Sequence, residues 1–187
     1  MNQDVLMKTV ARLTNPPKGI LAIDESGPTC DKRFKALGVD TTLENRQAYR
    51  ELLVTAPEIE KYVSGYITFD ETLRQSTKDG RTFVSVLQSK CIDVGIKVDQ
   101  GTKDLPGNPI EKFTEGLEGL EERLKEYSDL GATFAKWRAV ITIGDPPAGD
   151  VDRVIRDVLD LEPLAVRVRD EAGVLHDLGD HDVPALH

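Results

Sequence analysis

Short apolar runs of strand length recur along most of the chain. The run at residues 19–24 ends in Asp24, and further runs occupy residues 64–69, 94–98 and 134–141. Runs of this length between polar segments are typical of strands buried within a sheet. The pattern therefore predicts four strands, and acidic residues follow the first two of them.

Helical periodicity fills the intervals between these runs. It predicts helices near residues 42–56 and 114–130, and a short amphipathic turn around Phe83. Thr41, with Glu44 three residues later, predicts a capping box at the start of the first helix. Strands that alternate with helices predict a parallel sheet, which can be an open doubly wound sheet or a closed barrel. The residues expected on the buried face of the first helix are Tyr49, Leu52, Leu53 and Ala56.

The composition changes after Gly144. Lys136 is the last lysine, Trp137 is the last aromatic residue, and all three histidines lie at residues 176–187. Two prolines at 146 and 147 mark the junction, as is typical of a linker or turn. We therefore expect a folded region at residues 1–145 and a tail of different character at residues 146–187. The tail has patterns for a helix at 151–159 and a strand at 164–168.

Charge and composition exclude several classes of partner. The net charge of −9 argues against nucleic acid and anionic membranes as partners, because both are polyanions. No apolar run has the length of a signal peptide or a membrane-spanning helix. Cys30 and Cys91 are too far apart for a zinc or redox motif, so we expect two reduced thiols in a cytoplasmic protein.

Two lysines stand out because they lie within apolar strands. Lys97 follows Ile96, and Lys136 follows Ala135. Each lysine taken alone could be a salt-bridged or partly exposed side chain, but burial in a sheet can also create a base or an amine nucleophile. The two-residue period of a strand would place Arg138 on the same face as Lys136. Such clustered cations repel one another unless an anion, such as a phosphate or a carboxylate, lies between them.

The loop after the first strand offers the corresponding carboxylate. Asp24 is the candidate partner of the lysines, although a residue of this type can equally cap a turn. Ser26 and Thr29 supply hydroxyls that are either turn residues or ligands. The histidines show no spacing suited to a metal, so we expect no metal site.

Five motifs carry these residues in order along the chain. Together, and with their spacing, they resemble class I fructose-bisphosphate aldolase over about residues 4–145. That family is an eight-stranded α/β barrel, so the resemblance implies about the first four strands of a partial (β/α)8 barrel. The motifs are Lys18-Gly-Ile-Leu-Ala-Ile-Asp24-Glu-Ser26, Glu44-Asn-Arg46, Phe69-Asp-Glu71-Thr-Leu73, Gly95-Ile-Lys97-Val-Asp99-Gln-Gly101 and Phe134-Ala-Lys136-Trp-Arg138.

The resemblance implies a reaction and roles for the matching residues. The family cleaves fructose 1,6-bisphosphate in glycolysis to dihydroxyacetone phosphate and glyceraldehyde 3-phosphate, with no metal or other cofactor. A lysine forms an iminium that acts as an electron sink. Asp24 is implied to lie beside the carbinolamine and the C4 hydroxyl, and Lys97 and Lys136 to be active-site cations, with Lys136 assisting carbinolamine formation and dehydration. The implied substrate contacts are Ser26, Arg33 and Arg138, with the arginines near a phosphate.

The chain departs from this family in its second half. The family's Schiff-base lysine and its acid/base glutamate belong to strands beyond the four that the sequence predicts. No lysine follows Lys136, and neither Glu162 nor Glu171 lies in the expected glutamate motif. A frameshift near residue 145, a truncated gene model and a decayed gene would each produce this picture. The abrupt change in composition favours the frameshift.

Because of these departures, resemblance to the family does not imply that this chain is active. We expect the chain alone to be inactive, and its partner to be a phosphorylated sugar. One alternative is another Schiff-base barrel lyase, such as a transaldolase, that uses Lys97 or Lys136. A second is a non-catalytic fragment that binds phosphosugars or associates with an intact aldolase. Half a barrel has two sheet edges, so we expect a homo-oligomer or an aggregation-prone chain.

Overall fold

The computed structural model describes residues 3–140 and two short strands at 168–169 and 175–176. The chain divides into two compact units, and each is described by itself. The sheet unit comprises Lys8–Lys97 and Glu126–Lys136. The hairpin unit comprises the described parts of Met1–Met7, Val98–Lys125 and Trp137–His187.

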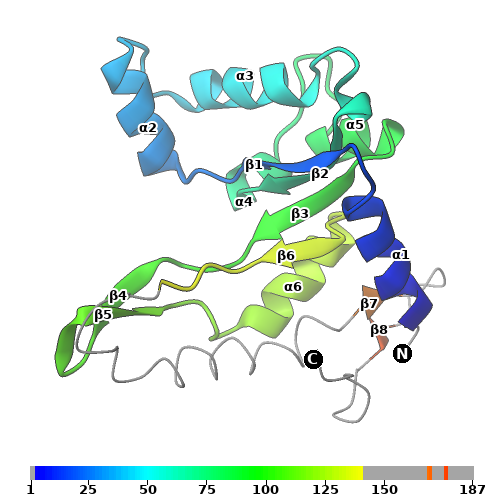
Figure 1. Cartoon of the computed structure of the whole chain (residues 1–187). Coiled ribbons are helices and arrows are strands. Elements are labelled where there is room, and N and C mark those ends of the chain that lie inside the picture. Colours follow the sequence, from blue (N-terminus) through cyan, green and yellow to red (C-terminus); the bar gives the residue numbers. More distant parts are fainter. Residues whose placement is uncertain (1–2, 141–167, 170–174, 177–187) are drawn as a thin grey trace. The chain divides into compact units, whose positions relative to one another are not determined.

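A four-stranded parallel sheet forms the centre of the sheet unit (Figure 1). Its strands lie in the order β1 (Gly19–Ile23), β2 (Val63–Thr68), β3 (Asp93–Lys97) and β6 (Phe134–Lys136). This confirms the four predicted strands and their parallel, adjacent arrangement. The fourth strand is shorter than predicted, because its pairing with β3 ends where β3 itself ends, at the partners Lys97 and Lys136.

Helices connect the strands of this sheet. The two predicted helices are present as α3 and α6, and the predicted turn around Phe83 is α5. The further helices α1, α2 and α4 and the 3-10 turn η1 lie in segments where the sequence pattern predicted none. The helical elements are α1 (Gln3–Leu13), α2 (Gly27–Ala36), α3 (Leu43–Val54), η1 (Ile59–Lys61), α4 (Asp70–Leu73), α5 (Phe83–Ser89) and α6 (Leu120–Asp129).

The core of the sheet unit lies between α3, α5 and one face of the sheet. Side chains alternate along a strand, so Tyr66 and Ile96 point to the same side, as the register of β2 with β3 requires. Both are fully buried, and the Tyr66 hydroxyl donates a hydrogen bond to the Leu53 carbonyl oxygen in α3 at 2.8 Å. Phe83 and Leu87 of α5 complete the apolar layer. The strongest burial in the sheet unit is therefore on the helix-covered face.

The opposite side of the sheet is here called the inner face. The Phe134 ring lies so close to Gly95 that an added Cβ would meet it at 2.3 Å, and a Cβ on Gly65 would meet Leu13 Cδ2 at 2.6 Å. Two glycines therefore make room for larger side chains on this face. By the strand register, the inner face consists of Ile20, Ala22, Gly65, Ile67, Asp93, Gly95, Lys97, Phe134 and Lys136.

The hairpin unit contains an antiparallel pair, β4 (Thr102–Leu105) and β5 (Asn108–Thr114). Gly107 in the connecting turn has a φ of 82°, a conformation that glycine adopts without strain. The pairing with β4 occupies Asn108–Thr114, so α6 begins at Leu120 rather than near residue 114 as predicted.

The tail is described at only four residues. They form the antiparallel pair β7 (Val168–Arg169) and β8 (Leu175–His176). The predicted helix at 151–159 lies outside the described residues, and of the predicted strand at 164–168 only Val168 is described. No helix in the described part of the chain combines the length and apolar character needed to cross a membrane.

Candidate active site

Three of the predicted site residues meet at one edge of the sheet. Asp24 directly follows β1, while Lys97 and Lys136 are the last residues of β3 and β6. The carboxyl ends of parallel strands lie at the same edge, and Lys97 and Lys136 are direct register partners. The structure therefore brings these three residues together on the inner face, as the sequence predicted. Ligands in α/β barrels bind at this end of the strands.

An ion pair connects two of the three. Lys136 Nζ donates to Asp24 Oδ2 at 2.6 Å, with side-chain exposures of 31% and 14%. The strands that carry them are not neighbours, because β2 and β3 lie between. Three strand spacings would separate β1 from β6 by about 14 Å in a flat sheet. The sheet must therefore curve towards the inner face for these side chains to meet.

The charges at this edge suit an anionic ligand. Two ammonium groups and one carboxylate carry a positive formal charge overall. A lysine hydrogen-bonded to a carboxylate can exchange a proton with it, which is the arrangement that general acid/base chemistry at a carbonyl requires. The second lysine, Lys97, lies beside Lys136 on the same face and can contribute charge to an oxyanion.

A buried arginine anchors the loop that carries Asp24. Arg50 is 2% exposed and donates hydrogen bonds to the Glu25 carbonyl oxygen at 2.8 Å, to Cys30 Sγ at 3.0 Å and to Thr72 Oγ1 at 3.2 Å. It also forms an ion pair of 3.2 Å with Glu25 Oε2, a buried oxygen that accepts no hydrogen bond among the described residues. Arg50 thereby links α3 to the segments that follow β1 and β2.

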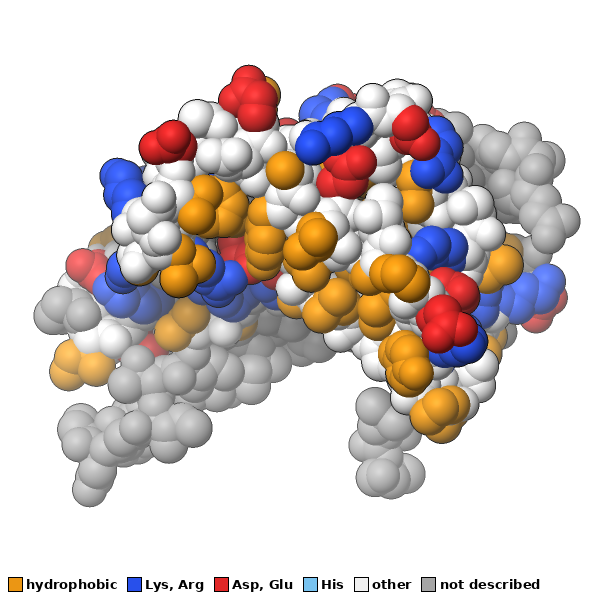
Figure 2. Space-filling view, turned by 90° about the horizontal axis from the view of Figure 1, so that it is seen from above, with side chains coloured by type: hydrophobic (Ala, Val, Ile, Leu, Met, Phe, Trp, Pro, Cys, Tyr) orange, Lys and Arg blue, Asp and Glu red, His pale blue; other side chains and the backbone are white. Residues whose placement is uncertain are grey.

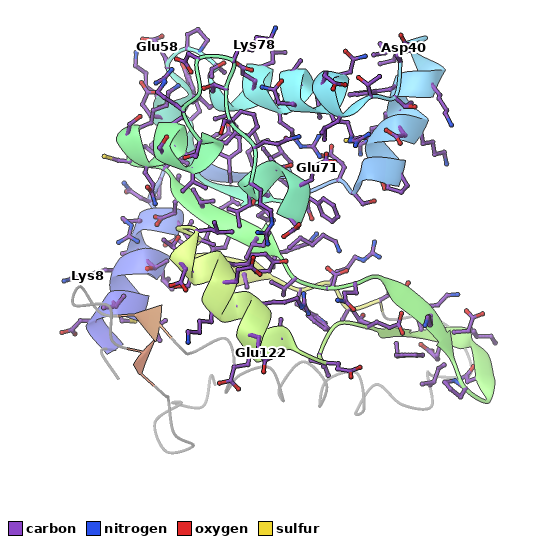
Figure 3. The ribbon with its side chains drawn as sticks, turned by 180° about the vertical axis from the view of Figure 1, so that it is seen from behind. Lys8, Asp40, Glu58, Glu71, Lys78 and Glu122 are labelled. Carbon is purple, nitrogen blue, oxygen red and sulfur yellow. The ribbon has the colours of Figure 1, made fainter. Side chains whose placement is uncertain are left out.

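A second arginine on α3, Arg46, makes a similar set of contacts. Arg46 donates to both carboxylate oxygens of Glu71 at 2.9 Å, and to Asp31 Oδ1 at 3.0 Å. Glu71 lies at the start of α4, on the side that faces α3 (Figure 3). The hydrogen bond from Arg46 to Glu71 is the main cause that raises the pKa of Arg46.

The sequence pattern did not identify Arg50 as a residue that supports the site, and it included Arg46 only as part of a motif. A signal was present, because the two arginines are four positions apart and so share one face of a helix. Hydrophobicity pointed instead to Leu52, which the structure leaves 71% exposed, while Arg50 and Val54 are the buried residues of α3. Of the predicted face, Leu52 is therefore wrong, whereas Tyr49, Leu53 and Ala56 are half-buried. The carboxylate and carbonyl oxygens around Arg50 explain why a cation is buried there.

The three predicted substrate contacts are placed differently from one another. Ser26 precedes α2, and its hydroxyl lies 3.1 Å from Thr29 Oγ1 instead of capping the helix. Arg33 is exposed and pairs with Glu25. Arg138 belongs to the hairpin unit, where its carbonyl oxygen accepts a hydrogen bond from Thr114 Oγ1 at 2.8 Å. Because β6 ends at Lys136, the expected strand alternation does not extend to Arg138.

The chemistry of the site also depends on whether nearby side chains could bind a metal ion. Within residues 3–140 and the two tail strands, His, Cys, Asp and Glu side chains form no group of three suited to a metal. Cys30 and Cys91 are free thiols, the first buried and the second exposed.

Comparison with known proteins identifies a family for most of the chain. Residues 5–153 match the family described as fructose-bisphosphate aldolase class-I. The "Probable fructose-bisphosphate aldolase class 1" of Xanthomonas campestris is 54% identical over 150 residues, which are 80% of this chain and 45% of that protein. "Fructose-bisphosphate aldolase 3, chloroplastic" of Arabidopsis thaliana is 51% identical over 145 residues, which are 78% of this chain and 37% of that protein.

A solved structure supports the same assignment. The fructose-bisphosphate aldolase of Plasmodium falciparum, solved with TRAP and a small-molecule inhibitor, is 43% identical with a TM-score of 0.76. The similarity covers 81% of this chain and 44% of that one, so the chain spans less than half the length of these relatives. The parallel four-stranded sheet is consistent with part of that family's barrel. By sequence and by fold, the chain belongs to the class I fructose-bisphosphate aldolase family.

Proposed function

We propose that this chain carries the first half of a class I aldolase active site and binds phosphorylated sugars there without cleaving them. The observation that carries the proposal is the ion pair of 2.6 Å between Lys136 and Asp24, with Lys97 in register beside Lys136. Carbonyl compounds that carry phosphate would meet a carboxylate and two amines at one edge of the sheet.

Each of these residues has a role in the proposal. Asp24 accepts a hydrogen bond from the C4 hydroxyl of the bound sugar, and Lys136 donates one to its carbonyl oxygen. The short contact between them supports proton exchange, because donor and acceptor are already within hydrogen-bond distance. Lys97 stabilises negative charge on the bound substrate.

The substrate contacts that the proposal takes from the sheet unit are Ser26 and Arg33, with Arg33 near a phosphate. The side chain of Arg33 is 59% exposed, and its partner Glu25 is also the partner of the buried Arg50. An exposed ion pair contributes little stability, so Arg33 can exchange Glu25 for a phosphate at small cost. Ser26 lies in the same loop as Asp24 and can add a hydroxyl donor.

Cleavage would need an electron sink that, by the family's pattern, residues 1–187 do not supply by themselves. The family's Schiff-base lysine is expected on a later strand than the four described, and residues 137–187 contain no lysine. Without an iminium, the C3–C4 bond has no acceptor for its electrons. We therefore expect binding of fructose 1,6-bisphosphate with no turnover above background.

Calorimetry and a coupled cleavage assay with EDTA test both parts of the proposal. The 187-residue chain should bind fructose 1,6-bisphosphate but not unphosphorylated fructose, and Lys136→Met should weaken that binding at least tenfold. Lys61→Met is the matched control, because Lys61 is an exposed lysine remote in sequence from the site and paired only locally, with Glu58. Equal binding by the two variants would contradict the proposed site.

Borohydride trapping with dihydroxyacetone phosphate distinguishes the alternatives. The proposal predicts no covalent adduct. An adduct that Lys136→Met abolishes would identify Lys136 as the nucleophile and the chain as a Schiff-base lyase of another kind. A chain that neither binds the sugar nor forms an adduct would leave association with an intact aldolase as the function to pursue.

A further inference from the structure

A buried carboxylate lies at the amino-terminal edge of the sheet, opposite the candidate site. Asp93 begins β3 and is 8% exposed. Its Oδ2 accepts a hydrogen bond from Arg12 Nε at 2.8 Å, and its Oδ1 accepts one from Arg12 Nη2 at 2.9 Å and one from Thr133 Oγ1 at 3.0 Å. Such donors compensate a buried carboxylate for its lost hydration. Asp93 therefore connects Arg12 of α1 with Thr133, which precedes β6, in one network of the sheet unit.

The burial of Asp93 distinguishes this network from ion pairs of the molecular surface. Figure 2 shows acidic and basic side chains next to one another at the surface of the sheet unit on the side of α3. Pairs such as Lys61–Glu58 and Arg81–Asp79 are exposed at both residues and contribute little to stability. A buried carboxylate that loses a partner keeps an uncompensated charge, which is strongly destabilising. Asp93 therefore constrains the elements that carry its donors.

The last residues of α1 are fixed at the same edge of the sheet by other contacts. Ser64 Oγ donates a hydrogen bond to the Leu13 carbonyl oxygen at 2.7 Å. The Leu13 side chain packs so closely on β2 that a Cβ on Gly65 would meet its Cδ2 at 2.6 Å. Figure 1 shows the end of α1 beside the starts of the strands, away from their arrowheads. Arg12 is thus held in place by its neighbours and acts as a fixed donor to Asp93.

The register of β6 decides where Lys136 lies. β6 pairs with β3 over three residues, the last of which is Lys136. A slip of one residue would turn every side chain of β6 to the other face of the sheet, and Lys136 would lose its contact with Asp24. Thr133 comes directly before the paired residues, and its N–H donates to the Val94 carbonyl oxygen at 2.7 Å while its hydroxyl donates to Asp93. A slipped β6 would break both of these hydrogen bonds.

We propose that Asp93 is a positioning residue for the candidate site: through Thr133 it fixes the register of β6, and it thereby places Lys136 within hydrogen-bond distance of Asp24. Because the site that it serves is the proposed sugar site, this role rests on the proposed function. Asp93 acts from the opposite edge of the sheet, so its contribution to sugar binding passes through Lys136.

The Phe134 ring is the competing determinant of this register, because it fills the space over Gly95. Apolar packing is not directional, so it disfavours a flipped strand but tolerates small shifts along the strand. Hydrogen bonds weaken steeply away from their preferred geometry. The hydroxyl of Thr133 therefore adds the precision that a contact of 2.6 Å between Lys136 and Asp24 requires.

Thr133→Val tests the proposal with a small change, because valine keeps the branched shape of threonine and lacks its hydroxyl. Calorimetry should show that fructose 1,6-bisphosphate binds this variant roughly fivefold more weakly, as expected for the loss of one hydrogen bond to a charged group. Thr133→Ser restores the hydroxyl and should bind like the unaltered chain. Thr55→Val is the matched control, because the Thr55 hydroxyl bonds to the Glu51 carbonyl oxygen at the end of α3, and it should leave binding unchanged.

A double variant separates positioning from general destabilisation. If Thr133 acts through Lys136, Thr133→Val should have no further effect on sugar binding in a chain that already carries Lys136→Met. Asp93→Ala repeats the comparison at the carboxylate itself. Circular dichroism checks that Asp93→Ala folds, and Thr133→Val decides the question if it does not.

Methylation of the lysines with carbon-13 formaldehyde gives a readout that needs no sugar. The nuclear magnetic resonance signal of Lys136 is identified by its loss in Lys136→Met. In Thr133→Val this signal should move towards those of exposed lysines, because the ion pair with Asp24 is weakened. It should stay in place in Thr133→Ser and in Thr55→Val.

The outcomes distinguish this proposal from the proposed function. An unaltered chain that does not bind the sugar contradicts the proposed function, and the Lys136 signal then decides by itself whether Asp93 places Lys136. An unmoved Lys136 signal in Thr133→Val overturns the positioning role and leaves Phe134 as the determinant of the register. A loss of sugar binding that is equally large with and without Lys136 also overturns it.

Discussion

At the scale of single residues, charged side chains decide where the loops of the site lie. Asp24 and Lys136 are 112 positions apart in the sequence and form one ion pair. Behind Asp24, Glu25 is approached by the buried Arg50 and by the exposed Arg33. One carboxylate thus has two cationic partners, of which Arg50 is buried and Arg33 is exposed.

Replacing Arg50 by methionine should lower the free energy of unfolding by about 3 kcal/mol, because it leaves Glu25 without its buried partner. Arg33→Met removes the exposed partner of the same carboxylate and should cost less than about 1 kcal/mol. Urea unfolding of the two variants measures the difference. Equal losses would show that burial of Arg50 does not anchor the loop.

At the scale of elements, α3 shows how a helix can be predicted correctly while its capping residue and its most buried residues are not. The predicted capping residue was Thr41, but the structure caps the helix with Thr42, whose Oγ1 accepts a hydrogen bond from the Asn45 N–H at 3.1 Å. Glu44 belongs to the same cap. Its carboxylate accepts a hydrogen bond from its own backbone N–H and a second one from the Thr42 side chain, and both lower the pKa of Glu44.

The two threonines offer a matched test of this cap. Thr42→Ala should lower the free energy of unfolding by about 1 kcal/mol, since it leaves a helix N–H without its acceptor. Thr41→Ala, one residue earlier, should have an effect within about 0.5 kcal/mol. Thermal unfolding followed by circular dichroism compares them. A larger loss for Thr41→Ala would restore the capping box predicted from the sequence.

At the scale of the whole sheet, the inner face depends on glycines that admit neighbouring side chains. The Phe134 ring of β6 occupies the space that a side chain on Gly95 of β3 would need. The same ring lies 3.3 Å from the position of a Cβ on Gly65. The pairing of β3 with β6, and with it the placement of Lys136 beside Lys97, therefore requires no side chain at Gly95.

Gly95→Ala should destabilise the protein by roughly 1–3 kcal/mol, because an aromatic ring cannot yield to a Cβ at 2.3 Å without a shift of the strand. Gly19→Ala in β1 meets no atom within 4 Å and should be close to neutral. Denaturant unfolding measures both changes, and sugar binding by the Gly95 variant reports whether Lys136 moves. A neutral Gly95→Ala would mean that the ring does not lie over this strand.

The sequence by itself determined the strands, their parallel alternation with helices, and the candidate residues Asp24, Lys97 and Lys136. These features are local, since apolar runs and the polar residues after them depend only on neighbours in the chain. Tertiary structure decided the burial of Arg50, the early end of β6 and the contact of Lys136 with Asp24. Each of these depends on groups that the fold brings together from distant positions. An arginine becomes a core residue only when carbonyl and carboxylate oxygens surround it, and a strand extends only as far as its neighbour pairs with it.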